Sequence, residues 1–234
     1  MSAAIDYDAR ELDVLAALEE RHFWFQVRRR IVIDALRRWF PSARAYLEIG
    51  SGTGFIAAGI RTAFPAWRVT ASDPLLSPQP IDMRAIPFAA AFDVIGAYDV
   101  LEHVEDDALA LQQLHAACRP GGGILLTVPQ HPFLWSPADD RAQHHRRYRR
   151  AELRAKLGAA GFERLAFTSF NTIALPLFIL RCLLLRGTGQ DVGAAVLPRP
   201  VDWGLRAAME ADRRLIGAGI DLPFGASLMV AAWR

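Results

Sequence analysis

The spacing of apolar residues changes character along the chain. Residues 9–40 carry apolar side chains at helical intervals among many charges, which predicts two amphipathic helices that break around Arg21–Phe25 and end before Pro41. From residue 43 onward, short apolar runs alternate with helical stretches. Strands that are apolar throughout are typical of a parallel sheet buried on both faces, so we expect an α/β fold.

The same pattern gives the expected elements and their order. The predicted strands are Ala45–Ile49, Arg68–Ser72, Phe92–Ala97, Gly123–Val128, Glu163–Ser169 and Ser227–Trp233. The predicted helices between them are Phe55–Phe64, Asp106–Cys118 and Arg150–Ala160. Residues 171–219 contain three prolines and form a predicted helical insertion, after which the last strand closes the sheet.

Composition narrows the class of protein. The chain has 234 residues, 52% of them hydrophobic, and a net charge of +2, which excludes long-range disorder and gives no nucleic-acid-binding footprint. The two cysteines, Cys118 and Cys182, cannot form a disulfide framework. With no signal-peptide pattern in residues 1–10, these features favour the cytoplasm.

One apolar run, Ile173–Leu185, needs separate consideration. As a helix it would rise about 20 Å, which is too short to cross a hydrocarbon core of about 30 Å. We first expect this segment to be buried, as a lid over an acceptor site. A dimer face and a helix lying at the inner surface of a membrane remain alternatives, the second favoured by Arg181 and Arg186.

The most informative motif follows the first predicted strand. Residues 50–54 read G-x-G-x-G and lead into a helix. Glycines let the backbone turn sharply and let a ligand approach the amide groups. A dinucleotide fingerprint would need glycine or alanine where this chain has Phe55, which makes NAD the weaker interpretation.

An acidic residue completes this motif at the end of the second strand. Asp73 lies where ligands bind in open α/β sheets, and its carboxylate could accept hydrogen bonds from both hydroxyls of a ribose. The alternative is that Asp73, followed by Pro74, only starts a turn.

Together these residues resemble the class I S-adenosylmethionine-dependent methyltransferases. The resemblance rests on the order and spacing of several motifs, namely Leu47–Gly54, Asp73, Asp82–Phe88, Phe92–Ile95, Asp99–Val104 and Arg119–Gly122. It implies a Rossmann-like fold with about seven strands, the last of them antiparallel. It also implies one domain over 1–234, divided into a helical cap (1–42), a cofactor-binding core (43–170), the helical insertion (171–219) and the final strand (220–234).

The resemblance also implies a cofactor site for S-adenosylmethionine. Glu48 would face the methionine ammonium, Asp82 would meet the adenine amino group, and Met83 would line the adenine pocket. The full set of expected cofactor residues is Glu48, Gly50, Ser51, Gly52, Gly54, Asp73, Asp82, Met83 and Tyr98.

The run Asp99–His103 admits three interpretations. Asp99, Glu102 and His103 would share one face of a helix, where Asp99 and Glu102 could form a capping box. His103, with Glu102, could instead serve as the catalytic base toward an acceptor hydroxyl. Some relatives, including ubiquinone-pathway O-methyltransferases, hold a divalent cation in a similar run, but we assign no metal here.

We expect the segment after Val128 to contact the methyl acceptor. This segment and Glu19–Arg29 resemble a subgroup with "P…D…H-x-R-R-Y" and "E-x-x-H-F-W-F-x-x-R-R" motifs. The expected acceptor contacts are His131, Trp135, His144, Arg147 and Tyr148. The alternative is a solvated loop whose arginines pair with nearby carboxylates. The aromatic residues Trp24, Phe25 and Phe40 are expected to cover the cofactor or to pack.

The sequence therefore predicts methyl transfer from S-adenosylmethionine to a small-molecule or lipid-like acceptor, with oxygen as the preferred acceptor atom. Two alternatives remain open. An NAD-dependent oxidoreductase would use the same sheet and Asp73, and a regulatory module would bind the nucleoside without turnover.

Overall fold

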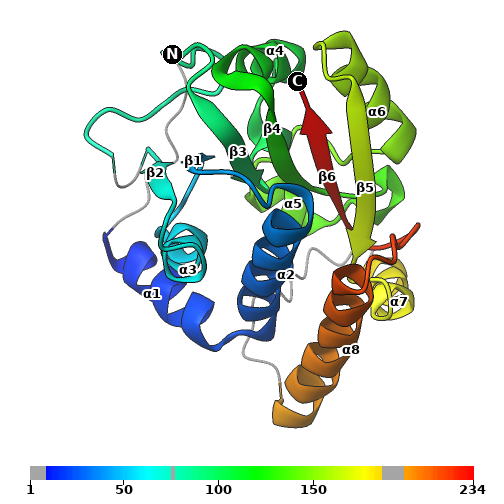
Figure 1. The fold of residues 1–234 in the computed structure, drawn as a ribbon. Coiled ribbons are helices and arrows are strands. Elements are labelled where there is room, and N and C mark those ends of the chain that lie inside the picture. The colour runs from blue at the N-terminus through cyan, green and yellow to red at the C-terminus, as the bar shows by residue number, and fades with distance from the viewer. Residues whose placement is uncertain (1–8, 75–76, 186–197) are drawn as a thin grey trace.

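The computed structural model describes residues 9–74, 77–185 and 198–234, and Arg186 therefore lies outside the described residues. Its sheet has six strands in the order β2-β1-β3-β4-β6-β5, and β6 runs antiparallel to both of its neighbours (Figure 1). The strands are β1 (Ala45–Ile49), β2 (Arg68–Ser72), β3 (Phe92–Tyr98), β4 (Cys118–Pro129), β5 (Arg164–Phe170) and β6 (Ser227–Trp233). The mainly parallel sheet and the antiparallel last strand are confirmed.

The expected strand count was one too high for the part of the chain that the structure describes. No strand forms among the described residues between β2 and β3, a segment interrupted by Pro74, Pro80 and Pro87. Proline has no N–H group to donate to a ladder and is therefore unfavourable in a central strand.

Helices cover both faces of the sheet. They are α1 (Ala9–Arg21), α2 (Phe23–Trp39), α3 (Phe55–Ala63), α4 (Asp107–Ala117), α5 (Pro137–Arg141), α6 (Arg150–Ala159), α7 (Leu175–Leu185) and α8 (Arg199–Gly217). Single 3₁₀ turns form at Leu101–His103 and Pro132–Leu134. The N-terminal helices were predicted from the spacing of apolar residues, and α7 and α8 lie within the predicted helical insertion.

The sheet separates two hydrophobic layers because neighbouring strand residues point to opposite faces. Val94 packs with residues of α2, α3 and α8, whereas Ile95 packs with residues of α4 and α6. In Figure 1, α8 runs beside α2. The N-terminal helices and the insertion thus share one side of the molecule.

Helix α7 is not buried as we first expected. Leu177 and Leu180 are each 51% exposed, although Cys182 Sγ lies 3.6 Å from the carbonyl oxygen of Leu134. The side chain of Arg181 lies outside the described part of the chain. Among the described residues, no helix combines the length and apolar character needed to span a bilayer.

A buried ionic cluster ties α4 to α6 and to the loop before it. Asp107 is buried and accepts hydrogen bonds from Lys156 Nζ at 2.7 Å and from the Tyr148 hydroxyl at 2.8 Å, and Arg146 lies 2.8 Å away. Burial raises the pKa of Asp107, but the hydrogen bonds from Lys156, Tyr148 and Arg146 outweigh it, and the net pKa is lowered. Lys156 is the single lysine of the chain.

We predict that Asp107→Asn lowers the free energy of unfolding by about 3 kcal/mol at pH 7, because it leaves cations without their buried partner. A depressed folded-state pKa stabilises the fold above the unfolded value of 3.8, and that contribution is lost as the pH falls through the folded pKa. The difference between wild type and variant should therefore shrink below about pH 4 in urea titrations.

The matched control is Asp221→Asn, which removes an exposed ion pair with Arg38. Its cost should stay below about 1 kcal/mol. Equal losses for the two variants would contradict a special role for Asp107.

Candidate active site

The loop between β1 and α3 has a backbone that requires glycine. Gly50, Gly52 and Gly54 all have positive φ, at 69°, 54° and 83°. A Cβ at Gly50 would also collide with the side chain of Val100. At Gly52 and Gly54 a Cβ would meet nothing within 4 Å, so this bend faces open space. The loop thus leaves amide groups accessible to a ligand.

Asp73 lies against this loop, as the parallel pairing of β1 and β2 requires. Ile49 is in register with Ser72, and the amides of Gly50 and Ser51 both donate to the carbonyl oxygen of Ser72. The Gly52 amide donates to Asp73 Oδ2 at 2.7 Å. Asp73 therefore supports the glycine loop and lies at the sheet edge where a ribose was expected to bind.

A pocket of about 240 Å³ opens between the glycine loop and the N-terminal helices. Five of the predicted cofactor residues line it, namely Glu48, Gly50, Ser51, Gly52 and Tyr98. Trp24 and Phe25 also line it, in agreement with a covering role, whereas Phe40 instead packs against Trp233. The N-terminal helices therefore form one wall of the pocket.

Two polar contacts hold these helices against the loops of the sheet. Glu19 at the end of α1 accepts a hydrogen bond from the Thr53 hydroxyl in the glycine loop. Arg28 of α2 forms an ion pair with Asp99, which follows β3. We predicted neither contact. The sequence does place acidic and basic residues close together in Glu19–Arg29, which suggests polar contacts there. No local pattern shows which distant residues they contact.

Glu48 is a buried carboxyl at the pocket. Its side chain is 1% exposed, and burial raises its pKa to about 8. The Tyr46 hydroxyl donates to Glu48 Oε2 at 3.4 Å, and Tyr46 and Tyr98 share a hydrogen bond of 2.9 Å. Glu48 is therefore mostly protonated at pH 7, although the positive charge of Arg28 partly opposes this shift.

The helix expected to start at Asp99 is absent, which corrects the capping-box interpretation. Asp99 has a φ of 57°, accepts a hydrogen bond from the Thr127 hydroxyl at 3.0 Å and pairs with Arg28. Only the 3₁₀ turn Leu101–His103 follows, and α4 is capped instead by Asp106, which accepts from the Leu109 amide. Asp99 and Glu102 therefore do not cap a common helix.

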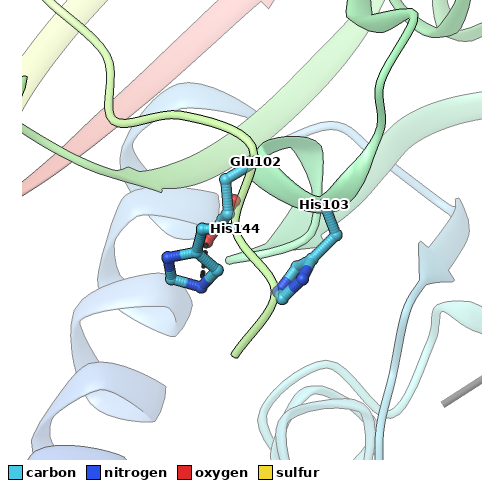
Figure 2. Close-up of side chains that lie close together, drawn as sticks. All are labelled: Glu102, His103 and His144. Atoms are coloured by element: carbon cyan, nitrogen blue, oxygen red, sulfur yellow. Dashed lines mark ion pairs between the residues drawn. The ribbon is translucent and has the colours of Figure 1, made fainter. Parts of the chain in front are cut away.

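Glu102 and His103 meet His144 from the loop after α5. Figure 2 shows the Glu102 carboxylate directed toward the His144 ring, with His144 Nε2 3.9 Å from Glu102 Oε1. The rings of His103 and His144 have centroids 4.7 Å apart. Burial, and then the neighbouring His144, lower the pKa of His103 to about 4. Burial raises the pKa of Glu102.

His144 and Arg147, two of the predicted acceptor contacts, bind the buried carboxylate of Asp139. Asp139 is 1% exposed; its Oδ1 lies 2.9 Å from His144 Nδ1, and Arg147 donates to both of its oxygens. Burial raises the pKa of Asp139, but the hydrogen bonds from His144 and Arg147 outweigh it and lower the pKa to about 2. Arg147 thus positions Asp139.

The other acceptor candidates separate into exposed and buried positions. Tyr148 is fully buried and donates to Asp107, which places it in the core and corrects its expected contact with the acceptor. Trp135 is partly exposed and donates to Asp140 at 2.9 Å. His131 is partly exposed, with its ring 5.1 Å from that of Phe133, and remains available for contact.

The two expected adenine contacts do not line this pocket. Asp82 is exposed and pairs with Arg84 at 2.7 Å, and Met83 is buried in the hydrophobic core. Gly54, the third glycine of the loop, is the N-cap of α3 and has a left-handed backbone conformation.

Comparison with known proteins places this geometry in a family. A family model described as a methyltransferase domain matches residues 20–166. A probable S-adenosylmethionine-dependent methyltransferase of Mycolicibacterium smegmatis is 30% identical over 166 residues, which is 64% of this chain and 63% of that protein. The chain therefore matches less than two thirds of the length of that relative.

Solved structures support the fold. The S-adenosylmethionine complex of phosphoethanolamine N-methyltransferase 2 from Haemonchus contortus has a TM-score of 0.62 at 17% identity, over 98% of this chain and 58% of that one. A putative methyltransferase of Haloferax volcanii, solved with the Trm112 activator, has a TM-score of 0.57 at 17% identity, over 95% and 97% of the two chains. This chain belongs to the methyltransferase-domain family and has the fold of the class I S-adenosylmethionine-dependent methyltransferases.

Proposed function

We propose that this protein transfers the methyl group of S-adenosylmethionine to the oxygen of a small-molecule or lipid-like acceptor. The observation that supports this most directly is the pocket of about 240 Å³ between the glycine loop and the helical cap. Glycines with positive φ, open space beside Gly52 and Gly54, and an acid at each of two adjacent strand ends suit a nucleoside that carries an amino acid.

The donor supplies a methyl group already activated by a cationic sulfur, so the residues of this chain mainly bind and orient. Asp73 would accept hydrogen bonds from the ribose, and Glu48 would face the methionine ammonium. Glu19 and Arg28 hold the helical cap against the loops that border the pocket. Holding the reacting groups in line can account for about 7–11 kcal/mol of the barrier.

The residues proposed to act on the acceptor belong to the group formed by Glu102, His103 and His144. At neutral pH the imidazole of His103 is neutral, because its pKa is about 4, and its buried Nδ1 has no hydrogen-bond partner among the described residues. His103 would take the proton from an acceptor hydroxyl, with Glu102 beside it. His131 and Trp135 would contact the body of the acceptor.

A lipid-like acceptor fits the exposed apolar residues of α7. Leu177 and Leu180 are half exposed, and a separate hollow beside Trp203 on α8 is lined by Arg30, Arg206, Arg214 and Glu210. Exposed apolar side chains favour contact with lipid, and cations on the same protein favour a surface that carries anionic lipid. We therefore propose that residues 173–185 touch the membrane peripherally.

We predict that S-adenosylhomocysteine binds the wild-type protein and that Asp73→Ala weakens binding by about 10- to 150-fold, the loss of one charge-assisted hydrogen bond at about 1.5–3 kcal/mol. Isothermal titration calorimetry measures both constants. Asp140→Ala, which changes an exposed carboxylate, serves as the control and should bind as wild type. Unchanged affinity in Asp73→Ala would remove Asp73 from the site.

The affinity for S-adenosylhomocysteine should rise with pH between 6 and 7.5. Burial raises the pKa of Glu48 to about 8, so an approaching ammonium must drive a proton off this carboxyl, and less work is needed at higher pH. Calorimetry in two buffers of different ionisation enthalpy should detect proton release at pH 7. Glu48→Gln should abolish it; release that persists in Glu48→Gln would exclude this carboxyl as its source.

Vesicles that contain anionic lipid should co-sediment the protein at low salt, and Leu177→Glu with Leu180→Glu should reduce the bound fraction at least several-fold. Leu109→Glu changes an exposed leucine of α4 and serves as the control. If wild-type protein stays in the supernatant at low salt, the membrane proposal is wrong, while the cofactor site is untouched by that result.

A further inference from the structure

Three potential ligand side chains converge where β3 ends. Glu102 and His103 lie in the 3₁₀ turn after β3, and His144 comes from the loop after α5, about 40 residues later. One nitrogen or oxygen atom from each residue lies within 4.8 Å of those of the other two. Figure 2 shows the three side chains gathered around one small region between these two segments.

Three polar atoms of this group lack hydrogen-bond partners among the described residues. Glu102 is fully buried, and neither of its carboxylate oxygens has a hydrogen bond to any described residue. The Nδ1 atom of His103 is also buried and without a partner in the described chain. Buried polar groups are almost always paired, because an unpaired one costs about 1–3 kcal/mol or more. Several unpaired atoms in one place therefore point to a missing ligand.

Both imidazoles are held as metal-binding imidazoles are held. His144 Nδ1 lies 2.9 Å from Asp139 Oδ1, which leaves Nε2 facing Glu102. The ring of His103 has a backbone hydrogen bond with Ala142, while its Nδ1 is the unpartnered atom. Histidines that bind metals commonly donate their other N–H group to a carboxylate or a carbonyl oxygen, which fixes the ring.

We propose that Glu102, His103 and His144 bind a divalent transition-metal ion of the zinc type. Two imidazole nitrogens and one carboxylate oxygen are a donor set for such ions, with an open coordination position left for another ligand. Magnesium and calcium prefer sites made of oxygen atoms and fit this set poorly.

The distances need only a small adjustment. Bonds of about 2.0–2.1 Å place tetrahedral ligand atoms about 3.4 Å apart. His144 Nε2 and Glu102 Oε1 are 3.9 Å apart, and all three ligand atoms lie within 4.8 Å of one another. Closing by at most about 1.4 Å is within the reach of side-chain rotation.

The proposed ligand set differs from the Asp99–His103 run seen in the sequence, because Asp99 is not part of it. Asp99 is held by Arg28 and Thr127, and the third ligand is instead His144. Asp99 also lines the pocket, so the metal would lie next to the proposed methyl-transfer site. There its open position would bind an acceptor hydroxyl and lower the pKa of that hydroxyl, and the proton would pass to solvent, because His103 would be a ligand and no longer a free base.

The test uses full-length protein that has been stripped of metal with a chelator and dialysed. Calorimetry with Zn²⁺ should show one tight site per chain, and Co²⁺ should give visible absorption bands of a four- or five-coordinate ion. Glu102→Gln and His144→Ala should each weaken Zn²⁺ binding by more than the roughly 10- to 100-fold that loss of an outer partner costs.

His145→Ala is the matched control, because His145 is the adjacent, exposed histidine. It should bind Zn²⁺ as wild type does. Zn²⁺ should also raise the melting temperature of wild type and His145→Ala, but not that of Glu102→Gln. Metal-free Glu102→Gln should melt no lower than metal-free wild type, since it removes a buried acid, so a lost shift cannot be attributed to misfolding.

Either of two results would overturn the inference: no stoichiometric Zn²⁺ binding to wild type, or equal binding by wild type, Glu102→Gln and His144→Ala. Preference for Mg²⁺ over Zn²⁺ would contradict the donor set. Binding of S-adenosylhomocysteine to Glu102→Gln, measured in parallel, keeps this result separate from the proposed function, since the metal site can fail while the cofactor site remains.

Discussion

The hydrogen bond from the Gly52 amide to Asp73 joins the end of β2 to the glycine loop that lines the pocket. It exists because β1 and β2 are parallel and in register, so that both chains leave the sheet at the same edge. The left-handed glycines then turn the loop back toward α3, and amide groups remain exposed at its tip. Every other feature of the site is arranged around this bend.

The surroundings of three buried carboxyl groups differ, and so do their charges. Asp139 stays ionised because Arg147 and His144 compensate for its burial. Glu48 accepts a hydrogen bond from the Tyr46 hydroxyl, but burial raises its pKa to about 8, so its charge can respond to a ligand. Neither carboxylate oxygen of Glu102 has a hydrogen-bond partner among the described residues, and His144 Nε2 lies 3.9 Å from one of them. The same carboxyl group thus serves as a structural anchor, a responsive group or a potential ligand, according to what surrounds it.

The N-terminal helices form part of the site. Glu19 and Arg28 reach the glycine loop and the residue after β3, so the start of the chain closes a pocket made by its middle. α8 packs along α2, and the helical insertion therefore supports the cap from outside (Figure 1). A change in either helix should be felt at the pocket, since packed helices transmit displacements.

The sequence by itself determined the order and bounds of most elements and the glycine loop, because these depend on local apolar spacing and on backbone freedom at single residues. Ala45–Ile49, Arg68–Ser72 and Ser227–Trp233 form strands with the predicted limits. Only the tertiary structure decided the partners of charged residues. Asp99 pairs with Arg28 instead of capping a helix, and Tyr148 is in the core. Such pairs join residues far apart in the chain, and their positions depend on how the packed layers meet, which local patterns do not encode.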